Sequence, residues 1–170
     1  MKKLFYGMLC IYLSVFATVS FAQDKTILSP KDLKPLIGTW QGNLIYMDYS
    51  SNKPYSMPAN LIVKQLSDPN QFQLSNIYPD EPKANGFDTL IITQDGKYLN
   101  GEIIKSIKNT SDGSTVIVTE KKGVDGNDDK PAVIKHTFTL NSKVFIIRKD
   151  VMFDGSNQWL NRHEYTYTRK

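Results

Sequence analysis

The side chains that could do chemistry in this chain are two histidines and a few acids on separate segments. Asp48 together with His136 or His163 would make an acid–base pair, in which a carboxylate orients an imidazole for proton transfer. No Gly-x-Ser-x-Gly elbow, phosphate-binding loop, His-Glu-x-x-His helix or dinucleotide fingerprint occurs in the sequence. We therefore assign no catalytic residue, and a small barrel enzyme remains the third functional alternative.

One segment has part of the spacing of a calcium-binding loop. Asp125, Asn127 and Asp129 match the first three ligand positions of such a loop. Lys130 then occupies the position that needs glycine, and His136 occupies the position of the bidentate glutamate. The segment is therefore interpreted as an acidic, solvent-exposed hairpin, and no metal or cofactor is assigned.

These side chains must be positioned by strands, because strand-forming runs with a period of two recur from Gly38 onward. A short helical turn precedes them, since Ser29-Pro30-Lys31-Asp32 has an N-cap residue followed by proline. The predicted strands are Thr39–Tyr49, Met57–Leu66, Phe72–Tyr78, Phe87–Thr93, Tyr98–Lys108, Thr115–Lys122, Ala132–Leu140, Lys143–Val151 and Trp159–Arg169. Most connections are short, which favours pairing of consecutive strands in a meander.

A long meander left open would expose two sheet edges, and closure into a barrel removes them. The fold class predicted is therefore all-β, a single antiparallel up-and-down barrel of about eight to nine strands. A β-sandwich is the main structural alternative, but it needs longer crossover connections. The two long loops predicted here are Pro79–Gly86 and Gly123–Pro131.

The N-terminus has the pattern of a secretory signal peptide. Lys2 and Lys3 precede an apolar run, and Ser20-Phe21-Ala22 resembles a cleavage site. We expect residues 1–22 to be removed and residues 23–170 to form one domain, secreted or periplasmic. Cleavage would also remove Cys10, the sole cysteine. Loss of the two lysines would lower the formal net charge from +4 to +2, which gives nucleic-acid binding little support.

The segment Leu36-Ile37-Gly38-Thr39-Trp40-Gln41-Gly42 resembles the Gly-x-Trp signature of lipocalin and calycin barrels, as found in uncharacterised exported bacterial proteins. The resemblance implies a barrel whose tryptophan packs across the closed end beneath an arginine from the last strands. Arg162 is our first choice for that arginine and Arg148 our second. Nitrobindin-like barrels bind haem through one histidine, but the chain lacks the fuller motif of that family.

Counting by two from Trp40 places Tyr46 and Asp48 on the inner face near the open end. A bulge that changes the register, or a solvated mouth, would leave Asp48 without a role. His136 shares the apolar phase of its strand, as a core histidine also would.

We expect the barrel to bind a small, largely apolar ligand. The predicted ligand-binding residues are Tyr46, Asp48, His136, Arg148 and Tyr165. The alternative is an envelope protein–protein interaction or inhibitor module that uses the barrel as a scaffold. The expected state is a monomer or weak dimer without stable membrane insertion.

Overall fold

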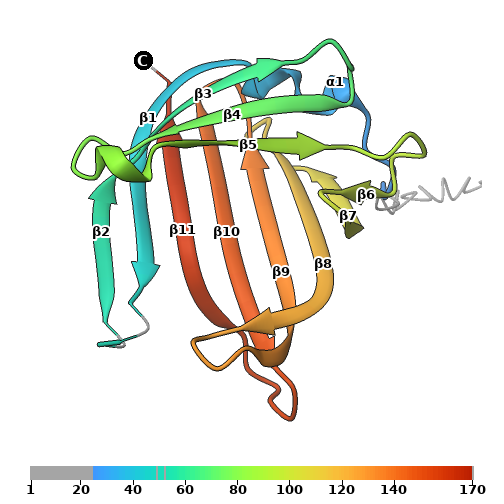
Figure 1. Ribbon diagram of the computed structural model, residues 1–170. Helices are drawn as coiled ribbons and strands as arrows, with labels where there is room; N and C mark the ends of the chain where they lie inside the picture. Colours follow the sequence, from blue (N-terminus) through green and yellow to red (C-terminus); the bar gives the residue numbers. More distant parts are fainter. Residues whose placement is uncertain (1–24, 49, 52, 170) are drawn as a thin grey trace, which may run out of the picture.

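The strands predicted from the sequence form one antiparallel sheet that curls into a nearly closed barrel (Figure 1). The computed structural model describes residues 25–48, 50–51 and 53–169, so the predicted signal peptide lies outside the described residues. The helical elements are α1 (Pro30–Leu33), η1 (Lys34–Leu36) and η2 (Pro82–Ala84). The strands are β1 (Gly38–Met47), β2 (Pro54–Pro58), β3 (Asn60–Gln65), β4 (Gln71–Ile77), β5 (Gly86–Ile91), β6 (Tyr98–Leu99), β7 (Glu102–Asn109), β8 (Thr115–Asp125), β9 (Lys130–Leu140), β10 (Val144–Phe153) and β11 (Leu160–Thr168).

The order of strands around the barrel follows the chain. The sheet runs β5-β4-β3-β1-β11-β10-β9-β8-β7-β6, with β2 also paired to β1. An isolated bridge between Ile92 and Leu99 joins its two ends. The prediction of an all-β, antiparallel barrel with a short helical turn is confirmed, and the barrel is nearly closed.

The predicted strand number of eight to nine is wrong, because two predicted strands are each divided in two. Within the described residues the sheet has eleven strands. The chain bends at Ala59, so that β2 pairs with the C-terminal part of β1 and β3 with its N-terminal part. Asn100 and Gly101 both have positive φ (52° and 74°), as a tight hairpin turn requires, and they separate β6 from β7.

The predicted loop Gly123–Pro131 is mostly a hairpin. β8 continues to Asp125 and β9 begins at Lys130, and these two residues lie opposite each other. The acidic segment is therefore the tip of a long β8–β9 hairpin.

Trp40 closes one end of the barrel. Its side chain is fully buried with Leu33 and Leu36 of the helical turn, and its Nε1 donates a hydrogen bond to the Leu36 carbonyl at 2.8 Å. The turn begins with a capping box, in which the Ser29 backbone N–H donates to the Asp32 carboxylate at 2.7 Å.

The cation that lies over the Trp40 ring is Arg169. The prediction that Arg162 or Arg148 would occupy this position is therefore wrong. The Arg169 guanidinium lies 4.1 Å from the ring centre and donates to the carbonyls of Pro35 and Ile37 at 2.9 Å each. Gln41 lies opposite Thr168 in the β1–β11 pair, so the residue after Thr168 comes beside Trp40. Arg162 lies roughly 23 Å further along the strand, at about 3.3 Å per residue.

Replacing the arginine on Trp40 should therefore destabilise the closed end. We expect Arg169→Met to lower the free energy of unfolding by about 1–2 kcal/mol, through lost cation–π contact and hydrogen bonds to carbonyls. Urea unfolding measures this, with Lys64→Met on exposed Lys64 as the control. Equal stability of the two variants would contradict this role for Arg169.

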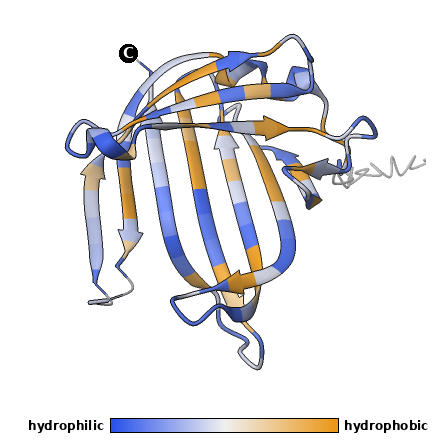
Figure 2. Cartoon of the chain, in the orientation of Figure 1, coloured by the Kyte–Doolittle hydropathy of each residue, from blue (hydrophilic) through white to orange (hydrophobic). Residues whose placement is uncertain are grey.

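The barrel interior has two apolar clusters, and a polar belt that includes His136 of β9 and Lys149 of β10 separates them along these strands. The larger cluster contains Trp40, Phe138 and Phe145, and the smaller one contains Ile134 and Val151. Along β9 and β10, hydrophilic segments lie midway between hydrophobic ones (Figure 2). No helix among the described residues is long and apolar enough to cross a membrane.

Candidate functional site

A cavity of about 310 Å³ lies where the larger apolar cluster meets the polar belt. This volume falls at the lower end of the range usual for small-molecule sites. Its apolar lining residues are Leu74, Leu90, Leu99, Phe138, Ile147, Tyr165 and Tyr167. Its polar lining residues are Asn76, Asp88, Thr89, Asn100, Glu102, His136 and His163.

Glu102 organises the polar side of the cavity. The residue is 4% exposed, and its carboxylate accepts hydrogen bonds from Thr119 Oγ1 at 2.6 Å and His136 Nδ1 at 2.8 Å. Lys121 Nζ lies 3.1 Å from its other oxygen. Burial acts to raise the pKa of Glu102, but the hydrogen bonds from His136 and Thr119 outweigh it and lower this pKa.

The ionised Glu102 carboxylate determines which ring nitrogen of His136 carries the proton. A carboxylate only accepts hydrogen bonds, so Nδ1 of His136 must carry the proton. Nε2 is then the ring nitrogen of His136 that remains for a ligand in the cavity. This carboxylate–imidazole pair resembles the acid–base arrangement considered from the sequence, with Glu102 in the place expected for Asp48.

His163 continues the row of rings from His136. The two imidazole centres are 6.4 Å apart, and Tyr165 packs edge-on against His163 at 5.5 Å. Burial, followed by the charges of His136 and Lys149, lowers the pKa of His163 to about 4. His163 is therefore an uncharged donor and acceptor at neutral pH.

The lowered pKa of His163 predicts a loss of stability on mild acidification. The unfolded chain gains a proton near pH 6.5 and the folded chain only near pH 4, so stability falls as the pH drops through this window. We expect about 2 kcal/mol of loss from this group between pH 7 and pH 5. Urea unfolding of His163→Leu should show a correspondingly flatter pH profile, and an unchanged profile would contradict the assignment.

The two tyrosines beyond His163 form the apolar wall. The Tyr165 and Tyr167 rings stack with centres 5.8 Å apart, and the Tyr165 hydroxyl lies 3.0 Å from the Tyr78 hydroxyl. Burial raises the pKa of Tyr165, so its hydroxyl stays protonated. The predicted ligand-binding residue Tyr165 thus lies in the cavity wall.

Beyond the cavity, Asp125 lies in a buried ion cluster. Its carboxylate contacts Lys149 Nζ and Arg162 Nε at 2.7 Å each, and all three side chains are less than 20% exposed. The register of β10 and β11 shifts between Lys149 and Asp150. This bulge lets Arg162 reach Asp125, so Arg162 is a structural residue at a different place from the one expected.

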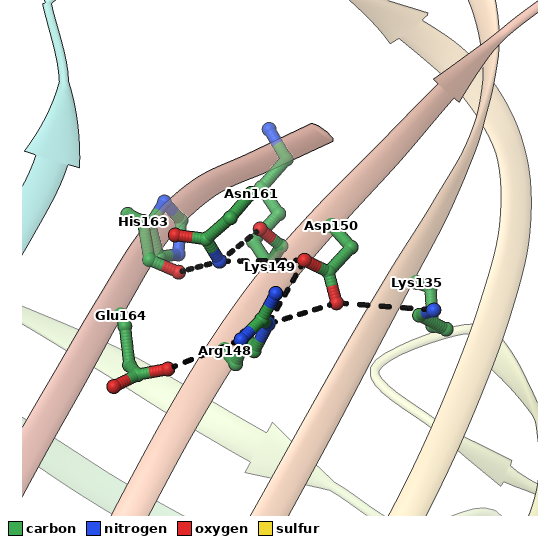
Figure 3. Close-up of polar contacts among 7 residues, drawn as sticks. All are labelled: Lys135, Arg148, Lys149, Asp150, Asn161, His163 and Glu164. Carbon is green, nitrogen blue, oxygen red and sulfur yellow. Dashed lines mark hydrogen bonds and ion pairs between the residues drawn. The ribbon is translucent and has the colours of Figure 1, made fainter. Parts of the chain in front are cut away.

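Arg148 lies on the outer face of the barrel and does not line the cavity. Figure 3 shows it directed toward Asp150 and Glu164, with Nε 2.9 Å from Asp150 and Nη1 3.7 Å from Glu164. Its phase on β10 is opposite to that of Ile147, a cavity residue. Lys135 contacts the same Asp150 carboxylate at 3.8 Å.

The other predicted ligand-binding residues divide between the cavity and its surroundings. His136 lines the cavity. Tyr46 packs against the larger core cluster and against Tyr55, with ring centres 5.4 Å apart. Asp48 accepts hydrogen bonds from the backbone N–H groups of Ser50 and Ser51 at 2.6 and 2.9 Å, so it holds the turn after β1 and does not line the cavity.

Sequence reasoning missed Glu102, the central polar residue of the cavity. Within β7, Glu102 shares its phase with the buried Ile104. A strand predicted to begin at Tyr98 hid this alternation, because the turn at Asn100 and Gly101 interrupts it. A strand boundary placed at the Asn-Gly pair would have revealed an acid in an inward position.

No cluster of three or more His, Cys, Asp or Glu side chains in the described part of the chain could hold a metal ion. The acidic side chains at the tip of the β8–β9 hairpin do not point toward a common site. Asp125 faces Lys149 and Arg162, whereas Asp128 pairs with Lys130 at 3.2 Å. The residues present therefore do not form the calcium loop that their spacing resembles.

Comparison with known proteins finds structural neighbours that are distant in sequence. No family model matches the chain, and no curated protein matches it. The crystal structure of Rv2717c from M. tuberculosis is similar with a TM-score of 0.49 and 11% identity, over 85% of this chain and 99% of that one. A protein of unknown function from the DUF3598 family of Nostoc punctiforme has a TM-score of 0.37 and 13% identity, over 86% and 51% of the two chains. Both proteins are distant structural neighbours of this chain.

Proposed function

We propose that the protein binds a small, largely apolar ligand inside its barrel. The observation that carries this proposal is the cavity of about 310 Å³, in which apolar and aromatic walls meet a few convergent polar groups. Sites of this composition are typical of small-molecule binding, because the walls supply affinity and the polar groups supply orientation.

The polar groups support a ligand with one polar end. Glu102 and His136 are fixed by mutual hydrogen bonding, and Tyr165 is fixed by stacking on Tyr167. A preformed site of this kind loses little conformational entropy when it binds a ligand. The ligand body would pack on Phe138 and Tyr165, with its polar end toward the polar residues of the lining.

We also propose that the barrel is lipocalin-like and that the protein is secreted or periplasmic. The Gly-x-Trp segment, with Trp40 beneath Arg169, supports a lipocalin-like barrel. The signal-like N-terminus supports a secreted or periplasmic binding protein, active as a monomer or weak dimer.

The experiment is a titration with N-phenyl-1-naphthylamine, an uncharged aromatic probe that fluoresces in apolar surroundings. Protein refolded from denaturant, and so freed of any carried ligand, should bind one probe per chain in a saturable manner. A signal no larger than that of unfolded protein, over the full titration, would overturn the proposal.

A further inference from the structure

The charged side chains that line the cavity are carboxylates. Asp88 and Glu102 line it, whereas no Lys or Arg among the described residues does so. Lys121 partly balances Glu102 from outside the lining, at 3.1 Å. Asp88 is an exposed residue of the lining. It accepts a hydrogen bond from Asn76 Nδ2 at 2.8 Å, and within the described chain it has no ion-pair partner. The cavity therefore favours positive over negative ligands.

Two further cations, Lys149 and Arg162, do not supply positive charge to the cavity lining. Lys149 and Arg162 are held by Asp125 at 2.7 Å each, and neither lines the cavity. His163 stays neutral because burial lowers its pKa to about 4. An anionic ligand would thus meet two carboxylates and no Lys or Arg in the described lining of the cavity.

The aromatic wall also suits a cation. Phe138, Tyr165 and Tyr167 line the cavity, and the faces of such rings attract ammonium groups while their bodies accept apolar surface. Carboxylate and ring faces together are the usual surroundings of a bound organic ammonium group.

We infer that the ligand is an organic amine, with a protonated amino group on a small apolar or aromatic body. Asp88 is the carboxylate that pairs with this amino group, and the rings of Tyr165 and Phe138 hold the body. This inference rests on the proposed function and names the ligand class of the same cavity.

The test compares three ligands that share a naphthalene body: 1-naphthylmethylamine, 1-naphthylmethanol and 1-naphthylacetate. Calorimetry with the wild-type protein at neutral pH should show the amine binding at least about tenfold more tightly than the acetate, with the alcohol between them. Asp88→Asn should weaken the amine by about fivefold and leave the alcohol unchanged. Glu164→Gln, on the outer face of β11, is the control and should leave all three affinities unchanged.

The outcomes separate the two proposals. Binding of the alcohol together with equal or tighter binding of the acetate would overturn the amine inference and leave the proposed function standing. An amine affinity that Asp88→Asn does not change would also overturn the inference. Binding of none of the three ligands would overturn the proposed function and the inference with it.

Discussion

Filling the cavity should abolish ligand binding without unfolding the protein. Ile147 lines the cavity between Phe138 and Tyr165 on the neighbouring strands, and a tryptophan at this position would occupy the space of the ligand. We expect Ile147→Trp to weaken N-phenyl-1-naphthylamine by more than about tenfold, since a ligand loses its apolar contacts when its volume is taken. Fluorescence titration measures this loss.

The matched control is Ile146→Trp, one residue earlier on the opposite face of β10. The same substitution there adds the same surface outside the barrel, so probe affinity should stay within about twofold of wild type. Urea unfolding of both variants checks that the barrel is intact. Equal probe affinity of the two folded variants would show that the probe binds elsewhere.

Removing the charge of Asp125 should destabilise the fold strongly. We expect Asp125→Asn to lower the free energy of unfolding by about 3–5 kcal/mol, because it removes the negative charge that Lys149 and Arg162 contact at 2.7 Å each, with their side chains only 19% and 12% exposed. Urea unfolding at pH 7 measures the change, and an unchanged m-value would show that the unfolded state is the same. This cost is a large part of the stability of an ordinary domain.

Two further variants test the charge argument. Asp128→Asn removes an acid of the same hairpin that is 72% exposed, and it should cost less than about 0.5 kcal/mol. Lys149→Met combined with Asp125→Asn should recover part of the loss, because one buried cation is removed with its partner. A loss for Asp125→Asn no larger than for Asp128→Asn would contradict the buried ion cluster.

The architecture could be predicted because strand alternation and turn residues are local signals. The helical turn before Trp40, for example, depends on Ser29, Pro30 and Asp32, which are neighbours in sequence. The division at Ala59 could not be predicted, since it arises where β1 pairs with β2 along one part and with β3 along the other. That choice of partner is set by curvature of the whole barrel.

The lining of the cavity was predicted in part, and each misplaced residue has its own physical cause. His136 and Tyr165 were found because alternation along one uninterrupted strand places them inside. Arg148 was misplaced because its outward phase on β10 was not followed. Arg162 was misplaced because it lies seven residues before Arg169, roughly 23 Å along β11 at about 3.3 Å per residue. Asp48 has the inward phase of β1, but the turn after that strand uses its carboxylate.

The most direct test is a crystal structure of the refolded protein with N-phenyl-1-naphthylamine. We expect electron density for one probe inside the barrel, between Phe138 and Tyr165, with the N–H of the probe toward the polar groups around Glu102. Density for the probe on the outer surface, with side chains filling the interior, would contradict a ligand-binding barrel.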